Sequence, residues 1–282
     1  MRAKSVVVIG LLATACAAIG DPSTTVPASS PSSPSTVAST IPPVIDCPGA
    51  GDFEEGGGIL AVDGAGSDAG RLGRISWQTS DQCETFVFEF ETAEGAPATT
   101  VPAMRLDHLE SFQVLRVSIG VGESVLTDQL VETPLVGRLY AVNALDTGMF
   151  VDLHLKGPAA ARARVESSPA RLVLDLRPGF VELAGASVIS DSVVLVSPSV
   201  RTGLPPDTTV SGYAMTSDGA VEVVATQGGQ VILDVTSPVA GEPPGWGEFR
   251  VDLSLPDGDS SVFIGQEGPD GLDGLAVDLT VG

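Results

Sequence analysis

Histidine and cysteine are scarce in this chain. Its 282 residues include two histidines, His108 and His154, and three cysteines. Neither histidine lies in a metal-binding spacing such as HExxH, the cysteines form no CxxC pair, and the sequence has no GxSxG or SxxK motif. The pattern therefore argues against a zinc hydrolase, a dithiol redox enzyme and a serine hydrolase. We predict no catalytic residue, no cofactor and no metal site.

Positive charge is also scarce. Lysine and arginine together number 14, against 36 aspartates and glutamates, which gives a formal net charge of -22 at pH 7. A field of this sign repels the phosphates of nucleic acids, so we exclude nucleic acid as a partner. It also repels phosphate-rich polymers and anionic lipid, so a ligand should be neutral, basic, a protein, or bridged by divalent cations. The alternative interpretation is that the acidity only keeps the protein soluble.

The apolar run near the N-terminus, residues 6–15, is too short to cross a bilayer as a helix, which takes about 20 residues. It follows a basic start, and we assign residues 1–15 as an export signal peptide. The sequence LATA before Cys16 resembles the bacterial lipobox. That resemblance implies that Cys16 is acylated, with chains such as palmitate, and anchors the protein to the outer face of the cell membrane. Ala13 stands where the lipobox usually has Leu, Ile or Val, so cleavage by an ordinary signal peptidase nearby stays an alternative.

A linker follows the anchor. Residues 21–43 consist mainly of Ser, Thr, Pro and Ala, with almost no charge and no periodicity. Such a composition cannot bury enough apolar surface to offset the entropy of ordering the chain, and its prolines favour extended conformations. We therefore predict that residues 16–44 comprise the lipidated cysteine and a disordered tether.

Cys47 and Cys83 are left as a pair if Cys16 takes lipid. Disulfides persist in the compartments to which exported proteins go, so we predict a Cys47–Cys83 disulfide. On the chain-entropy model, closing a loop of about 36 residues stabilises the fold by roughly 3–4 kcal/mol. A metal or redox site is the functional alternative, but neither histidine lies near the two cysteines in the sequence.

A period of two dominates residues 45–180, which we predict to form a β-sandwich-like domain. In residues 85–91, TFVFEFE, the three phenylalanines alternate with other residues and should face a core. The same alternation occurs in residues 149–155, MFVDLHL, where we expect Asp152 and His154 to face solvent. Further strands are expected at residues 111–120, 136–144 and 171–177, and a short helical turn at residues 106–112.

Residues 190–282 have the spacing of an immunoglobulin-like sandwich. Short apolar runs recur at intervals of roughly ten residues, separated by Gly, Pro, Asp and Ser. The seven runs are VVLVSP, TTVSGYA, AVEVVAT, QVILDVT, GEFRVDLSL, SVFIGQE and LAVDLTV. The predicted fold class is therefore all-β, with two sandwich-like domains after the signal peptide and linker.

Both domains resemble known bacterial families. Residues 45–180 contain CETFVFEFE at residues 83–91 and PARLVLDLRPG at residues 169–179, and these two segments are similar to the AMIN-like domains of actinobacterial lipoproteins. The resemblance implies a β-sandwich that targets peptidoglycan or envelope assemblies and has no catalytic residues. Residues 190–282 resemble the immunoglobulin-like domain named after bacterial spore-germination lipoproteins. The segments that carry this second resemblance are VSGYA, GAV, GEF and DGLAVDLTV.

Two acidic loops and one tryptophan are candidate ligand sites. The sequences around Asp257 and Asp270 could bind calcium through carboxylate oxygens, but Asp-Gly pairs are also usual in hairpin turns, which we favour. Trp246 lies between glycines, where we expect a loop. It could stack on a sugar ring, but we favour a role in closing the end of the sandwich.

The function predicted from the sequence is a non-catalytic cell-envelope lipoprotein that binds or scaffolds peptidoglycan or envelope proteins. One alternative is a regulator of, or accessory to, a cell-wall hydrolase, with a site between residues 94 and 148. That stretch contains a charged group that could do acid and base chemistry, formed by Arg105, Asp107, His108 and Glu110. A solute-binding lipoprotein is a further alternative, although the helical signals are few.

Overall fold

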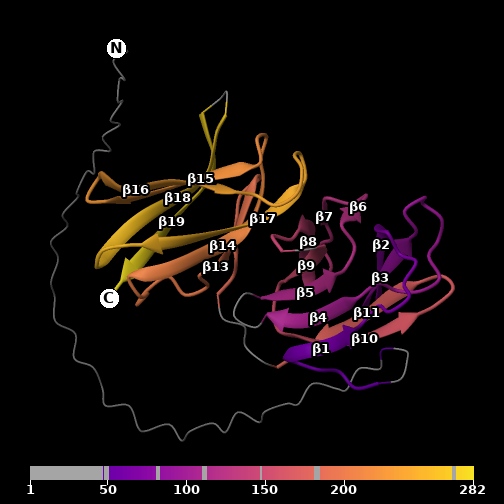
Figure 1. The fold of residues 1–282 in the computed structure, drawn as a ribbon. Helices are drawn as coiled ribbons and strands as arrows, with labels where there is room; N and C mark the ends of the chain where they lie inside the picture. Colours follow the sequence, from indigo (N-terminus) through magenta and orange to yellow (C-terminus); the bar gives the residue numbers. More distant parts are fainter. Residues whose placement is uncertain are drawn as a thin grey trace, which may run out of the picture. The chain divides into compact units, whose positions relative to one another are not determined.

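Strands dominate the computed structural model, which describes Cys47 and residues 51–80, 83–109, 113–146, 148–180, 185–268 and 271–282. These residues form nineteen strands and no helix (Figure 1). The all-β class predicted from the alternating pattern is therefore confirmed. Among the described residues there is consequently no helix of the length and hydropathy that a membrane span requires. The predicted signal peptide, Cys16 and the linker lie outside the described residues.

The strands form three sheets. The N-terminal sheet contains, in spatial order, β10 (Ala159–Glu166), β11 (Arg171–Pro178), β3 (Cys83–Glu91), β2 (Arg71–Ser80) and β6 (Glu123–Ser124). The C-terminal sheet contains β16 (Gln230–Pro238), β15 (Ala220–Gln227), β18 (Gly258–Gly268) and β19 (Gly271–Val281).

The central sheet is shared by both halves of the protein. Its order begins with β1 (Gly57–Val62), β4 (Met104–Leu109), β5 (Val114–Ile119), β9 (Met149–Leu155) and β8 (Val136–Asn143), with β7 (Asp128–Leu130) also paired to β8. It continues through β17 (Trp246–Ser254), β14 (Asp207–Met215), β13 (Val193–Ser197) and β12 (Val188–Ile189). The two parts meet at a parallel bridge between Asn143 in β8 and Gly247 in β17.

The first sandwich packs the N-terminal sheet against β1, β4, β5, β9 and β8. The predicted inward set in β3 is correct, because Phe86, Phe88 and Phe90 are almost fully buried and belong to this core. Alternation along a strand places these side chains on one face. The helical turn predicted at residues 106–112 is wrong for its described part: residues 106–109 belong to β4, because their side chains alternate between the core and the other face of the sheet.

The second sandwich packs the C-terminal sheet against β17, β14, β13 and β12. Each of the seven apolar runs predicted in residues 190–282 forms one strand, β13 to β19. Strands β13, β14 and β17 face β16, β15, β18 and β19 across a separate core that includes Val223, Phe249 and Leu279. This arrangement of antiparallel strands in two facing sheets is immunoglobulin-like.

A third buried cluster joins the two sandwiches, and we call it the junction. It draws side chains from β8, β9, β13, β14 and β17, namely Tyr140, Val142, Phe150, Val194, Val196, Tyr213 and Trp246. The contacts of the chain group Val44–Gly282 into one compact unit. The predicted division between residues 180 and 190 falls between β11 and β12.

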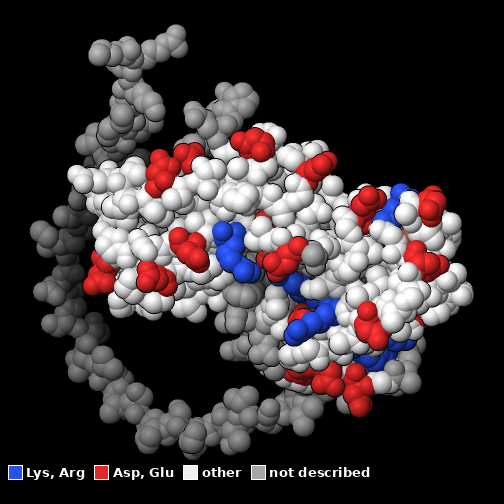
Figure 2. All heavy atoms as spheres, in the orientation of Figure 1, with Lys and Arg blue, Asp and Glu red and all other residues white. Residues whose placement is uncertain are grey.

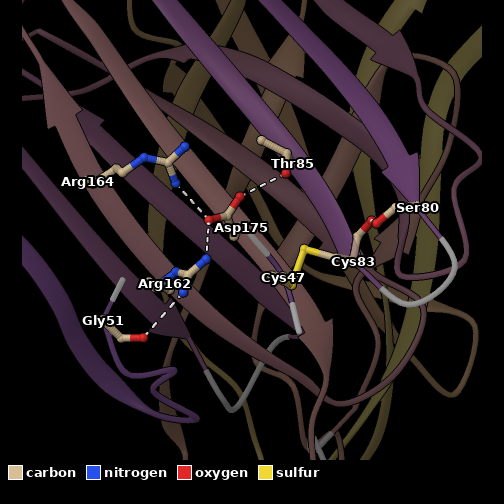
Figure 3. Close-up of a disulfide and its surroundings, with 8 residues drawn as sticks. All are labelled: Cys47, Gly51, Ser80, Cys83, Thr85, Arg162, Arg164 and Asp175. Carbon is tan, nitrogen blue, oxygen red and sulfur yellow. Dashed lines mark hydrogen bonds and ion pairs between the residues drawn. A yellow bond between two sulfur atoms is a disulfide. The ribbon is translucent and has the colours of Figure 1, made fainter. Parts of the chain in front are cut away.

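The predicted disulfide is present. Cys47 and Cys83 are bonded, with their Cα atoms 5.5 Å apart, and Cys83 begins β3 (Figure 3). Beside it lies the buried carboxylate of Asp175, which accepts hydrogen bonds from Arg162, Arg164 and Thr85 at 2.8 Å each (Figure 3). Since Arg162 also donates to the carbonyl of Gly51, this group ties the start of the described chain to the N-terminal sheet.

Candidate functional site

A groove lies on the central sheet where the two sandwiches meet. It has a volume of about 600 Å³ and is lined by residues of β1, β4, β5, β9 and β17 and of the connections next to them. A smaller hollow of about 270 Å³ continues it and shares Arg116, Glu248 and Arg250 with it. We call this continuous depression the arginine groove, because Arg105, Arg116 and Arg250 line it.

Arg116 is the most firmly held of the three arginines. Its Nε and Nη2 donate to the two carboxylate oxygens of Asp152 on the neighbouring strand β9, each at 2.7 Å. Its guanidinium also lies over the ring of Phe150, 3.7 Å from the centroid. Burial acts to lower the pKa of Arg116, but the charge and hydrogen bonds of Asp152 outweigh it and the pKa lies above its usual value. Arg116 is therefore a fixed cation.

Arg105 and Arg250 form more exposed parts of the groove. Their side chains are 69% and 61% exposed. Arg105 extends from β4 and its Nε donates to Asp107 at 2.8 Å, whereas Arg250 of β17 comes no closer than 3.9 Å to its carboxylate neighbour Glu248. Both residues alternate with apolar neighbours along their strands, and this alternation aims them away from the cores.

The acidic partners in the groove lie deeper than the arginines. Asp107 and Glu248 have side chains 16% and 15% exposed, and the side chain of Asp152 is fully buried. Glu248 also accepts a hydrogen bond from the backbone N–H of Leu145. In Figure 2, several Lys and Arg side chains lie near the middle of this face with Asp and Glu side chains between them, and further Asp and Glu side chains are scattered over the rest of the face. The groove thus presents guanidinium groups on a molecule that is acidic overall.

The junction holds the two sides of the groove in place. His154 of β9 and the hydroxyl of Tyr213 in β14 are hydrogen-bonded, and both residues are buried. The indole Nε1 of Trp246 donates to Asp128 at 3.1 Å, and Asp128 also pairs with Arg138. Burial lowers the pKa of His154 to about 4 and raises the pKa of Tyr213. These groups are therefore uncharged near neutral pH and pack as an aromatic cluster.

Three predictions about this region are wrong. We expected Asp152 and His154 to face solvent, but both are buried because the second sandwich covers the outer face of β9. We favoured a buried Trp246 that closes the sandwich over one that stacks on sugar, and the burial is correct, but the loop in which we expected this residue is wrong. Trp246 instead begins β17 and is 1% exposed in the junction, on the face opposite the immunoglobulin-like core. Alternation of apolar and polar residues shows that the two faces of a strand differ, but it does not show which part of the protein covers each face.

The group proposed for acid and base chemistry is not assembled. Arg105 and Asp107 share one face of β4 and are ion-paired, whereas His108 points to the other face, where its Nδ1 lies 3.1 Å from the carbonyl of Glu55. Glu110 lies outside the described residues. Of the four, the structure places Arg105 in the arginine groove and leaves His108 buried.

The turns that we favoured for the acidic loops are present only in part, because residues 258–259 belong to β18 and residues 271–274 to β19. Asp257 precedes β18, and the next acidic residue, Asp259, accepts a hydrogen bond from Thr280 in β19 at 2.6 Å. Asp270 lies outside the described residues. Within the described part of the chain, no group of three or more His, Cys, Asp or Glu side chains is placed to hold a metal ion.

The groove was not predicted from the sequence, because Arg116 and Arg250 belong to different sandwiches. The alternation around Arg250 indicated an outward side chain but gave no information about its neighbours. Comparison of the chain with protein-family models, with curated proteins and with solved structures found no match. The features that bear on function are therefore the residues and geometry of the groove and the sequence of the N-terminal segment.

Proposed function

We propose that the protein is a non-catalytic binding and scaffolding module of the bacterial cell envelope. A lipid on Cys16 anchors it to the outer face of the cell membrane, and the arginine groove holds peptidoglycan or an envelope protein. The observation that carries the proposal is the construction of the groove: Arg116 is clamped by Asp152, while Arg105 and Arg250 extend into the same hollow from β4 and β17. The clamp preorganises Arg116, so little of its side-chain freedom is lost when a ligand arrives.

The placement of the histidines supports a binding role. His154 is 9% exposed, is hydrogen-bonded to Tyr213 and has a pKa lowered by burial, and His108 is buried against the carbonyl of Glu55. A general base must reach the proton it abstracts and have a pKa near the working pH. These two side chains instead help to fix the central sheet and the junction.

The N-terminal segment supports a place at the envelope. Residues 21–43, if extended in a polyproline-like conformation at about 3.1 Å per residue, would reach roughly 70 Å from the membrane. The folded body is fastened at Cys47 by the disulfide to Cys83. A tether of this reach allows an anchored module to contact wall material above the membrane surface.

Two measurements test the proposal. Intact mass of the native protein should show a diacylglyceryl-sized addition on Cys16, and a Cys16→Ala variant should leave the membrane fraction. The detergent-solubilised full chain should also co-sediment with purified cell wall or cross-link to an envelope protein, and an Arg105→Gln/Arg250→Gln variant should lose that binding. An unlipidated native protein that binds neither wall nor envelope proteins would contradict the proposal.

A further inference from the structure

The arginine groove has spare hydrogen-bond donors. Arg116 uses Nε and Nη2 for Asp152, and its Nη1 donates to no described residue. Arg105 uses Nε for Asp107, which leaves the terminal amino groups of its guanidinium without a bond to any described residue. The guanidinium of Arg250 makes no hydrogen bond within the described part of the chain. The groove is therefore lined by three arginines whose guanidinium groups have N–H donors available for a ligand.

The geometry of these donors suits a carboxylate. A guanidinium presents parallel N–H groups that match the two oxygens of a carboxylate, and such charge-assisted pairs are stronger than neutral hydrogen bonds. Lysine, which lacks this planar fork, does not line the groove. Each guanidinium group is also more exposed than the carboxylate it faces, and Asp146 adds one exposed carboxylate to the lining.

The rest of the groove limits what can carry the carboxylate. Its uncharged lining is largely apolar and comes from Val62, Ala103, Met104, Ile119, Ala144, Met149 and Phe150. At physiological salt the field of a charge is screened within about 8 Å, so the groove can attract a nearby carboxylate even though the chain carries a net charge of -22. A polyanion would extend beyond the groove and meet the acidic surface around it.

We infer that the arginine groove binds the carboxylate of a peptide whose neighbouring side chain is small and aliphatic. The carboxylate lies between the guanidinium groups of Arg105 and Arg250, with Arg116 beneath it, and the aliphatic group packs on the apolar lining. This inference rests on the proposed function, because it names the ligand class of the same groove. It excludes a phosphate polymer as the preferred ligand.

The first test is titration of the mature chain carrying Cys16→Ala, followed by backbone NMR. The probes are N-acetyl-alanyl-alanine, its C-terminal amide and inorganic phosphate. We expect the free acid to shift resonances of the groove and to bind about tenfold more tightly than the amide, since the charge-assisted hydrogen bonds are lost on amidation. Equal affinity for acid and amide, an absence of binding, or tighter binding of phosphate would each overturn the inference.

The second test uses variants. Arg105→Gln and Arg250→Gln should each weaken binding of the free acid by about tenfold, whereas Arg74→Gln should leave it unchanged. Arg74 is a matched control because its side chain is 65% exposed and ion-paired to Glu89 on the N-terminal sheet, outside the groove. All three side chains are exposed, so thermal unfolding should confirm that the variants fold. If Arg74→Gln weakened binding of the free acid equally, the net charge of the protein rather than the groove would determine the affinity.

Failure of this inference differs from failure of the proposed function. If the full chain binds cell wall or envelope protein but the free acid and its amide bind equally, the ligand class is wrong and the envelope role stands. If the free acid binds as expected but the full chain ignores all envelope material, the groove chemistry stands and the envelope role falls. If neither binds, both proposals fall.

Discussion

His154 of β9 is hydrogen-bonded to Tyr213 of β14, so a strand of the first sandwich and a strand of the second share a buried polar contact. The two residues are 59 positions apart in the sequence. Tyr140 and Trp246 pack around the Tyr213 ring, with ring centroids 5.1 and 6.0 Å away from it. The junction thus combines aromatic packing with a polar contact that specifies how its strands meet.

Removing this hydrogen bond should destabilise the protein. In Tyr213→Phe, the Nε2 atom of His154 loses its partner in a buried site, and the free energy of unfolding should fall by about 1–3 kcal/mol. Chemical denaturation measures the change. A loss below 0.5 kcal/mol, on the order of the effect of a neutral surface substitution, would show that the contact contributes little.

Tyr140→Phe is the matched control for that variant. The ring of Tyr140 is fully buried in the same cluster, but its hydroxyl has no hydrogen-bond partner among the described residues. Deleting an unpaired buried hydroxyl removes a desolvation cost, so this variant should be as stable as the wild type or slightly more stable. Comparable destabilisation by both substitutions would point to packing rather than the hydrogen bond.

Acidification should weaken the junction through His154. Burial lowers the pKa of His154 from 6.5 to about 4. The charge of Asp152 acts to raise this pKa, and the charges of Arg116 and Arg138 act to lower it. Between these values the unfolded chain binds a proton that the folded protein does not, so the free energy of unfolding falls as pH falls. The loss should total about 3 kcal/mol and level off below pH 4.

A His154→Gln variant isolates this pH effect. Glutamine keeps a hydrogen-bonding group near Tyr213 but does not titrate, so its stability should change less than that of the wild type between pH 6.5 and 4. Asp68 titrates outside this window, because backbone hydrogen bonds from Thr100 and Thr99 hold its pKa below 3.8. Parallel stability curves for the two proteins would exclude His154 as the cause.

The disulfide should stabilise the first sandwich. Cys47 and Cys83 are 36 residues apart in the sequence. On the chain-entropy model, their bond adds about 4 kcal/mol to the free energy of unfolding, because it restricts the unfolded chain. A Cys47→Ala/Cys83→Ala variant should lose this amount in denaturant unfolding. Adding a thiol reductant should lower the stability of the wild type and leave that of the variant unchanged. Equal unfolding midpoints for both proteins would contradict this account.

Removing the carboxylate of Asp175 should lower the free energy of unfolding more than removing a more exposed carboxylate does. It is 1% exposed and accepts hydrogen bonds from Arg162 and Arg164, and Arg162 is itself buried. Asp175→Asn removes a buried counter-charge of that cation, which should cost about 3–5 kcal/mol. Glu89→Gln is the control, since this residue pairs with arginines at a more exposed site and should cost about 1 kcal/mol or less. Similar losses would show that burial does not set the cost.

The sequence was sufficient to predict the strands. Alternation identified the buried face of β3, and each apolar run of the second sandwich became one strand, because strands with one face on a core require period two. The disulfide was predictable for a different reason: few cysteines leave few pairings. Each of these inferences depends on residues close together in the sequence or on a small number of candidates.

The groove and the junction were not predictable in this way. Asp152 and His154 lie on the polar face of β9, which suggested exposure, yet that face is covered by strands of the second sandwich. Whether a polar face meets water or another sheet depends on long-range packing, which one strand does not encode. Arg116 and Arg250 become neighbours in a groove through the packing of the two sandwiches, which includes the bridge of β8 to β17 and the junction.

The position of the disulfide also determines how mechanical tension enters the folded body. A pull along the N-terminal segment arrives at Cys47 and passes through the two sulfur atoms directly to Cys83 at the start of β3. While the bond is intact, the chain between the two cysteines bears none of this force. When it is reduced, the same pull acts on the 36-residue stretch between them, which can reach roughly 120 Å only if β1 and β2 are pulled out of their sheets. The oxidised cysteine pair therefore sets a fixed attachment point between the N-terminal segment and the sandwich.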